Sequence, residues 1–185
     1  MRLNILGKGM DRMPDLAFRM MALTFKIRDI FIHKDKVLDE FDIRQGQSVV
    51  DYGCGPGSYI RKASKLVGTE GKVYAVDIHE LAIEAVKKLI RKENLHNVTA
   101  LVVSKGRCPL DDNSIDLIYA LDMFHMVANP NTFLKELNRI SKPDGILYID
   151  NGHQKRAEAR TKINASEAWK IIEENPRYMK CRPIK

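Results

Sequence analysis

The chain has 185 residues, 44% of them hydrophobic, and a formal net charge of +7 at pH 7. This length favours a single domain, and the hydrophobic content is enough for a core. Cys54, Cys108 and Cys181 lie far apart, which excludes a disulfide framework or a zinc knuckle and suits a reducing cytoplasm. No apolar run is long enough to span a bilayer, and residues 1–14 lack the pattern of a signal peptide. We therefore expect a soluble, cytoplasmic protein.

An amphipathic helix is predicted before the first strand, followed by a second short helix over residues 33–41. We expect its apolar face to pack on the sheet layer, and the alternative is an adaptable cover over an apolar substrate. A membrane-surface role is less favoured, because Arg19, Lys26 and Arg28 make only a thin basic face. The apolar residues that recur at helical spacing, or widen that face, are Leu16, Phe18, Met20, Met21, Leu23, Phe25, Ile27 and Ile30.

From residue 47 onward, short apolar strands alternate with helical patterns. This alternation predicts an α/β fold, with a doubly wound, mostly parallel sheet between two layers of helices. Ligands of such sheets bind beyond the carboxyl ends of the strands, where the strand order reverses. We divide the chain into an N-terminal helical cover (1–44) and a main unit (45–185) that together form one compact body. The predicted strands are 48–52, 72–76, 98–103, 115–120 and 146–150, and the predicted helices are 58–67, 79–93 and 130–141.

A glycine-rich turn joins the first strand to the next helix and reads G-x-G-x-G from Gly53 to Gly57. Glycines allow a ligand to approach the backbone closely. A dinucleotide fold requires G-x-G-x-x-G, but Ser58 stands at the third glycine position, and an acid, Asp51, precedes the loop. This arrangement favours a nucleoside with a positively charged amino-acid tail over a pyrophosphate. A nicotinamide oxidoreductase remains the weaker alternative.

The second strand ends at Asp77, about twenty residues beyond the turn. An acid at this point can accept two hydrogen bonds from a ribose diol. Ile78 and His79 follow it and could flank an adenine ring. For His79 we favour an exposed position at the start of the helix.

These segments resemble the class I S-adenosylmethionine (SAM) methyltransferases, and the glycine turn resembles their motif I. The run Asp112-Asn113-Ser114-Ile115-Asp116 and the run Leu121-Asp122-Met123-Phe124-His125 are similar to segments of the small-molecule branch related to quinone-biosynthesis enzymes. The resemblance implies SAM as cofactor and S-adenosylhomocysteine as product. The cofactor-binding residues it implies are Asp51, Gly53, Cys54, Gly55, Gly57, Ser58, Tyr59, Asp77, Ile78, His79, Ser104, Lys105, Gly106 and Leu121.

Within this resemblance, Ser104 departs from the family. It stands where an aspartate usually accepts a hydrogen bond from the adenine amino group, so adenine selectivity is expected to be weaker. The backbone N–H of Lys105 is expected to face the adenine ring, and Leu121 to lie beside the methionine part of SAM. The segment Leu134 to Gly145 matches a further family signature, which we interpret as architectural, ending in a turn over residues 141–145.

The resemblance also places Asp122 and His125 in the methyl-transfer cleft as candidate catalytic residues, with His125 as a base if the acceptor carries a proton. Alternatively, His125 is a half-buried structural histidine and Asp122 caps the following short helix. A sharper hypothesis groups Asp122 with Asp150 and Asn151 as oxygen ligands of Mg²⁺, as in metal-dependent O-methyltransferases. We prefer the interpretation in which no metal ion takes part.

The C-terminal tail is predicted to hold a helix over residues 165–174, with Trp169 and Ile172 on its buried side, and a strand over residues 178–184. The family usually ends its sheet with a hairpin, but only one candidate strand, residues 178–184, remains in this tail. We therefore expect a shortened end with at most six strands and one possible edge strand.

These observations together predict a SAM-dependent methyltransferase with an unidentified small-molecule acceptor. The alternatives are a magnesium-dependent O-methyltransferase, a SAM-binding protein without activity, and an NAD-dependent oxidoreductase. The net positive charge permits nucleic acid as a partner, through a basic loop at 154–162, but a mobile surface loop is favoured there. The sequence does not indicate an oligomeric state.

Overall fold

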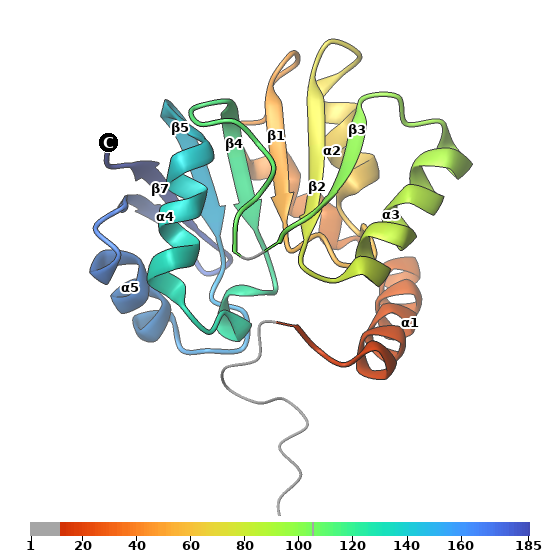
Figure 1. Ribbon diagram of the computed structural model, residues 1–185, viewed down its shortest axis with the longest axis horizontal. Coiled ribbons are helices and arrows are strands. Elements are labelled where there is room, and N and C mark those ends of the chain that lie inside the picture. The colour runs from red at the N-terminus through yellow and green to blue at the C-terminus, as the bar shows by residue number, and fades with distance from the viewer. Residues whose placement is uncertain (1–11, 105) are drawn as a thin grey trace, which may run out of the picture.

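The computed structural model describes residues 12–104 and 106–185, except the side chains of Lys26 and Ile30 (Figure 1). The prediction made for Lys105 therefore lies outside the described residues. The elements in chain order are α1 (Asp15–Phe31), the 3-10 helix η1 (Lys34–Glu40), β1 (Ser48–Tyr52), α2 (Ile60–Val67), β2 (Lys72–Asp77), α3 (Glu80–Glu93), β3 (Val98–Val102), β4 (Ile115–Ala120), the 3-10 helix η2 (Phe124–Met126), α4 (Pro130–Ile140), β5 (Ser141–Ile149), α5 (Arg156–Ala165), β6 (Trp169–Glu174) and β7 (Met179–Pro183).

The described strands form one seven-stranded sheet in the order β3-β2-β1-β4-β5-β7-β6. The first five strands are parallel, whereas β7 runs antiparallel to both β5 and β6. The strand order reverses at β1, which pairs with β2 on one side and with β4 on the other. The predicted doubly wound, mostly parallel sheet is confirmed, and the gap between the tips of β1 and β4 is where such sheets bind ligands.

Two apolar clusters cover the two faces of the sheet. On one face, Ile60 and Ala63 of α2, Ile83 of α3 and Leu38 of η1 pack against the strands. On the other face, Leu134 and Leu137 of α4 and Ile163 of α5 do the same. Figure 1 shows α4 in front of the sheet and α2 behind it. The helical pattern of the sequence produces these layers, because α2, α3 and α4 each turn one apolar side to the sheet.

The helix predicted over residues 165–174 is wrong. Strand β6 occupies most of this segment and pairs with β7, so the sheet ends in a complete antiparallel hairpin. Trp169 is buried at the start of β6, and its indole Nε1 donates to the backbone oxygen of Leu134 at 2.8 Å. Ile172, expected to be buried, is 42% exposed. An alternating strand, rather than a helix, explains why these two apolar residues differ in burial.

Two loop predictions also need correction. The basic segment 154–162 lies mostly in helix α5 and is not a mobile loop. The expected turn at 141–145 is the beginning of β5, where the register against β4 shifts between Ile115 and Leu117. The proline and glycine of this segment therefore mark an irregular strand start, as both residues do at bulges.

Helix α1 does not pack the face that its sequence predicts. Leu16 and Met20 are 73% and 58% exposed, and Leu23 and Ile27 also lie in solvent. The helix is held instead by its opposite side, where Phe18 is buried and stacks on the ring of His79. Because α1 is apolar on both sides, the sequence pattern alone could not show which side contacts the protein.

Candidate functional site

The glycine turn after β1 is folded onto the end of β2. The backbone N–H groups of Gly53 and Cys54 both donate to the carbonyl of Val76, at 2.8 and 3.1 Å. Gly53, Gly55 and Gly57 have φ angles of +81°, +50° and +93°, which favour glycine. A Cβ added at Gly53 would lie 2.8 Å from the Met123 side chain, whereas one at Gly55 would meet no atom within 4 Å. The turn is therefore packed on one side and open at Gly55, where a ligand can approach the backbone.

Asp51 lies directly below this turn and is only 2% exposed. Its Oδ2 atom is buried and has no hydrogen-bond partner of good geometry among the described residues, although the buried hydroxyl of Tyr119 interacts with Asp51. Burial, and then the neighbouring Asp77 carboxylate, raise the pKa of Asp51 well above its usual value, and the Tyr119 hydroxyl opposes this shift. An unpaired buried carboxylate is costly unless a cation or donor satisfies it. The residues present therefore fit a ligand that brings an ammonium group to this point, as the amino-acid tail of SAM does.

Asp77 joins the glycine turn to the beginning of α3. Its Oδ2 accepts from the backbone N–H of Gly55 at 2.9 Å, and its Oδ1 accepts from that of His79 at 2.8 Å. Burial raises its pKa, and the two backbone hydrogen bonds oppose that shift. Each carboxylate oxygen can accept a further hydrogen bond, so Asp77 keeps the capacity to bind a ribose diol.

His79 is buried rather than exposed, which corrects the sequence prediction. Its Nδ1 accepts from the backbone N–H of Leu81 at 3.3 Å and caps α3, and Phe18 stacks on its ring with centroids 4.3 Å apart. One face of the imidazole is thus covered by α1. Ile78 is half-buried and packs against the cluster on the α4 side of the sheet.

The loop after β3 is anchored by two residues of the predicted architectural signature. Glu136 accepts from the backbone N–H of Cys108 at 2.8 Å. Arg139 donates to the carbonyls of Cys108 and Leu110, at 3.0 and 2.9 Å. At the free end of this loop, exposed Ser104 forms backbone hydrogen bonds with Arg107. The signature on α4 therefore positions the loop that the resemblance places beside adenine.

Gly106 and Ser58 have different surroundings. Gly106 has a φ of +74°, and an added Cβ there would meet open space. Ser58 donates its hydroxyl to Asp29 of α1 and accepts from Arg28, which ties the glycine turn to the N-terminal helix. Cys54, Tyr59 and Leu121 are all buried around the turn.

The tips of β4 and β5 meet through Asp122 and Asp150. Asp122 has a φ of +59°, and its backbone N–H donates to both carboxylate oxygens of Asp150 at 3.0 Å. Asp150 also accepts from the backbone N–H of Gly152 at 3.0 Å. Burial, with a contribution from the Asp122 charge, raises the pKa of Asp150 to about 6. Asp150 therefore holds the strained turn that presents the Asp122 side chain.

Two cations that the sequence did not indicate neutralise the carboxylate of Asp122. Lys34 of η1 lies 2.8 Å from its Oδ2 and Arg28 of α1 lies 3.7 Å from it. Asp122 does not cap η2, because the residue at the cap position is Met123, which makes no side-chain cap. These ion pairs were missed because they join positions 88 and 94 residues apart, and no local pattern reports such a contact.

The magnesium alternative gains no support from this arrangement. Asp122 already faces two cations, and the amide nitrogen of Asn151 donates to the carbonyls of Gly152 and Gln154. Within residues 12–104 and 106–185, no cluster of three His, Cys, Asp or Glu side chains could hold a metal ion.

His125 lies in η2 and is partly buried. Its Nδ1 is buried without a hydrogen-bond partner among the described residues and faces Gly152, where an added Cβ would clash with the ring. The ring of His153 lies edge-on at 4.7 Å. Burial first, and then His153, lower the pKa of His125 below 6.5. The imidazole is therefore neutral at pH 7, which is the form that accepts a proton.

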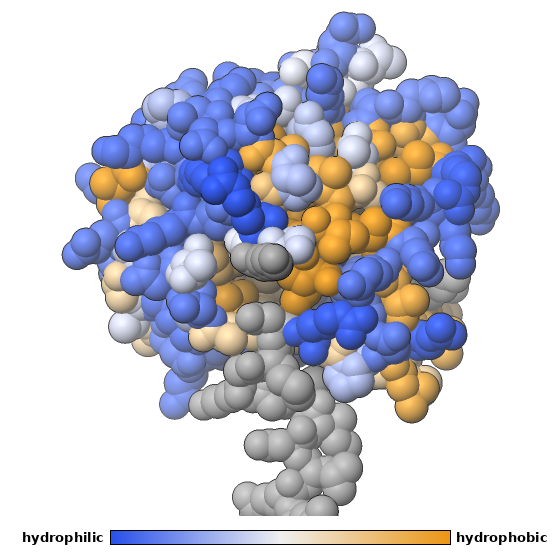
Figure 2. Space-filling model, in the orientation of Figure 1, coloured by the Kyte–Doolittle hydropathy of each residue, from blue (hydrophilic) through white to orange (hydrophobic). Residues whose placement is uncertain are grey.

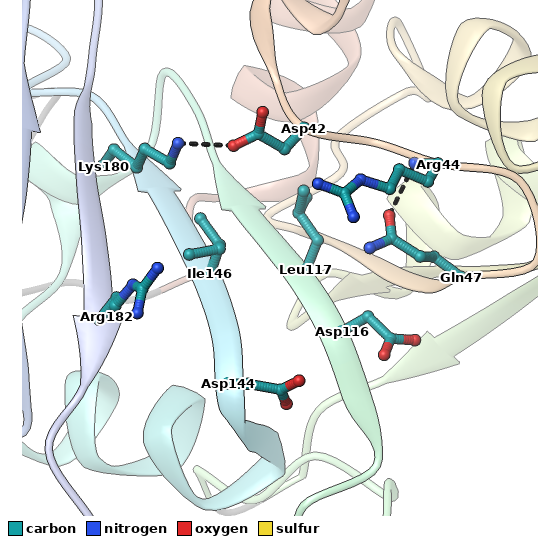
Figure 3. A pocket seen from close by; sticks show the side chains of 9 residues that line it. All are labelled: Asp42, Arg44, Gln47, Asp116, Leu117, Asp144, Ile146, Lys180 and Arg182. Atoms are coloured by element: carbon teal, nitrogen blue, oxygen red, sulfur yellow. Dashed lines mark hydrogen bonds and ion pairs between the residues drawn. The ribbon is translucent and has the colours of Figure 1, made fainter.

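A cavity of about 230 Å³ lies elsewhere, near the beginnings of β4 and β5 (Figure 3). Its lining is polar, and two of its charges, Lys180 and Asp42, pair with each other. Parallel sheets bind ligands beyond the carboxyl ends of their strands, so this cavity at the opposite end is not the candidate site. It is lined by Asp42, Arg44, Gln47, Asp116, Leu117, Asp144, Ile146, Lys180 and Arg182.

Residues 43–182 match a family model described as a methyltransferase domain. The chain belongs to this family. A demethylmenaquinone methyltransferase of Geobacillus stearothermophilus is 30% identical to this methyltransferase-family chain over 128 residues, which cover 69% of the chain and 54% of that protein. The chain thus spans about half the length of this curated relative.

Two solved structures share most of the fold. A SAM-dependent methyltransferase from Aquifex aeolicus aligns with a TM-score of 0.75 and 26% identity, covering 93% of this chain and 98% of that one. A Methanococcus maripaludis protein described as a putative SAM-dependent methyltransferase aligns with a TM-score of 0.76 and 17% identity, covering 96% and 98%. The family resemblance drawn from the sequence is confirmed, and these comparisons support SAM as the cofactor.

Proposed function

We propose that this methyltransferase-family protein binds SAM across the tips of β1 and β2 and transfers its methyl group to a small-molecule acceptor. The observation that carries the proposal is the buried, unpaired Oδ2 of Asp51 directly below an open glycine turn. A ligand ammonium group there would form a charge-assisted hydrogen bond and remove the cost of burying the carboxylate.

Asp77 would accept from the ribose hydroxyls while its backbone hydrogen bonds hold it in place. Ile78 would contact one side of the adenine, and the Ser104 loop, anchored by Glu136 and Arg139, would border it on the other. These groups all belong to the carboxyl ends of β1, β2 and β3, where a nucleoside can lie across them.

When bound, SAM supplies an activated methyl group on a sulfonium. The protein then has to align the acceptor with that methyl group and exclude water. Leu121 and Phe124 are buried at the tip of β4, which makes the protein beneath the acceptor position apolar. His125 takes a proton from the acceptor, if it carries one, at Nε2, because Nδ1 is buried against Gly152.

Calorimetry with SAM, S-adenosylhomocysteine and NAD tests the cofactor part of the proposal. Binding of the first two at micromolar concentrations, without binding of NAD, is expected. Binding of NAD alone would replace the proposal with an oxidoreductase.

Methyl transfer to a panel of small acceptors, with demethylated quinones first because of the named relative, tests the reaction. The expected result is transfer that stops when SAM is omitted. SAM binding without transfer to any member of a broad panel would favour a binding protein without activity.

A further inference from the structure

Helix α1 carries an apolar face that the protein does not cover. Nine large hydrophobic side chains are exposed among the described residues, and six of them lie in or directly after α1. Contiguous apolar surface of this kind marks an interaction site. In Figure 2 apolar surface is visible at the lower right, where Figure 1 places α1. The six residues are Leu16, Met20, Leu23, Ile27, Phe31 and Ile32, here called the α1 stripe.

The opposite side of the same helix holds the candidate site. Phe18 stacks on His79, Asp29 accepts from Ser58 of the glycine turn, and Arg28 lies 3.7 Å from Asp122. Helix α1 is therefore fixed against the candidate site, and a surface that covers the α1 stripe lies one helix away from that site.

The charges of α1 indicate which kind of partner fits. Helix α1 contains three basic residues, Arg19, Lys26 and Arg28, and two acidic residues, Asp15 and Asp29, which are ion-paired with Arg12 and Arg28. Arg19 borders the stripe in a helical projection, so two copies packed antiparallel through the stripe would bring their Arg19 charges to the same side of the contact. A negatively charged surface complements them instead, and the whole chain carries a net charge of +7.

We propose that the α1 stripe docks on an anionic lipid membrane surface and that the acceptor is a lipid-soluble molecule that enters the cleft from it. The sequence pattern disfavoured this role because the basic face of α1 is thin, but the structure leaves the apolar face of the helix exposed. A helix with an exposed apolar face and basic flanks lies in the interface plane of a bilayer and does not cross it. No helix within the described residues is long and apolar enough to span a bilayer, so the association is peripheral. The acceptor part of this inference rests on the proposed methyltransferase function, whereas the docking part does not.

Sedimentation with vesicles tests the docking. The wild-type protein is expected to bind vesicles that contain phosphatidylglycerol more tightly than vesicles of phosphatidylcholine alone. The double variant Leu23→Gln, Ile27→Gln is expected to lose about tenfold or more in vesicle affinity, because it removes two inserted aliphatic groups. The matched control is Ile172→Gln, Ile184→Gln, which changes two aliphatic residues that are 42% and 51% exposed elsewhere, and it is expected to bind like the wild type.

Two results would overturn the docking. One is an absence of wild-type binding to either vesicle, or equal loss in the stripe variant and the control. The other is a dimer in light scattering that the stripe variant dissolves, which would assign the stripe to a second copy of the chain.

The acceptor part is tested with two demethylated quinones, one with a long chain held in anionic vesicles and one water-soluble short-chain analogue. The stripe variant is expected to methylate only the long-chain compound about tenfold more slowly, and equal rates on both would contradict this part. Calorimetry with SAM on the same protein separates a failure of the proposed function from a failure of the docking. If the wild type binds vesicles but not SAM, the proposed function fails and the docking stands.

Discussion

The tips of β1 and β2 differ from the tips of β4 and β5 in how they are built. At the first pair, the candidate ligand groups are backbone atoms of the glycine turn and two carboxylates, Asp51 and Asp77. The hydrogen bonds of the turn and of Asp77 lie within about thirty residues of sequence. At the second pair, Asp122 is oriented by Asp150 and neutralised by Lys34 and Arg28, which come from distant segments. One half of the site is local in sequence and the other depends on tertiary contacts.

The two halves also differ in how their charges are compensated. Asp51 is buried with one unpaired oxygen, so its half of the site lacks a positive charge that a ligand can supply. Asp122 already has two cations beside it, and His125 is neutral. The arrangement therefore suits a cationic cofactor at β1 and β2 and an uncharged acceptor at β4 and β5.

The largest effect is expected at the local half. Asp77→Ala removes the acceptor of two backbone hydrogen bonds and of the ribose, so SAM affinity should fall about 100-fold, as calorimetry can measure. Asp111→Ala removes an exposed carboxylate that forms no ion pair with the described residues, and it serves as the control. Unchanged affinity in Asp77→Ala would show that the cofactor does not lie across β2.

His125→Ala should lower kcat about 100-fold while SAM affinity stays the same, because the residue is expected to act on the acceptor alone. His96→Ala is the matched control, since this exposed histidine lies between α3 and β3, away from His125. Equal losses in both variants, measured by steady-state kinetics, would leave His125 without a catalytic role.

Asp122→Asn tests whether Asp122 takes part in the reaction or only shifts the pKa of His125. Asparagine tolerates the left-handed backbone at this position. The Asp122 charge raises the pKa of His125, so its removal should lower that pKa further. The acidic limb of the pH–rate profile should then move to lower pH by less than about one unit, with kcat at pH 8 within about threefold. A large loss of kcat at pH 8 would give Asp122 a direct role.

The smallest effect concerns stability. The pKa of Asp150 is raised to about 6 in the folded protein, so the folded state binds a proton that the unfolded chain releases at lower pH. Its contribution to stability is present below about pH 4 and is lost as the pH rises through about 6. Asp150→Asn should remove this dependence, measured as the free energy of unfolding by urea denaturation between about pH 4 and pH 7. If the free energy of unfolding of the variant depends on pH as that of the wild type does, the raised pKa of Asp150 is contradicted.

The local half of the site could be predicted from sequence because its signals are local. The alternation of strands and helices, the glycine turn and Asp77 all lie within short windows whose geometry follows from backbone preferences. The roles of Glu136 and Arg139 could be predicted only as architectural, and the structure adds the loop that they hold.

The features that could not be predicted, in both halves of the site and in the rest of the fold, depend on tertiary contacts. His79 was expected in solvent because no sequence pattern near it predicts the contact with Phe18, which lies 61 residues earlier and covers its ring. The strand β6 was read as a helix because Trp169 and Ile172 fit helical spacing, although pairing with β7 decides the outcome. Likewise, α1 is apolar on two sides, and only the packed structure shows that the α1 stripe faces solvent.

A crystal structure of the complex with S-adenosylhomocysteine tests the central claim most directly. The account predicts the ligand across the tips of β1 and β2, with its amino group at hydrogen-bond distance from Oδ2 of Asp51 and its ribose on Asp77. A ligand bound elsewhere, for example in the polar cavity beside Arg44, or an Asp51 oxygen that stays unpaired in the complex, would contradict it.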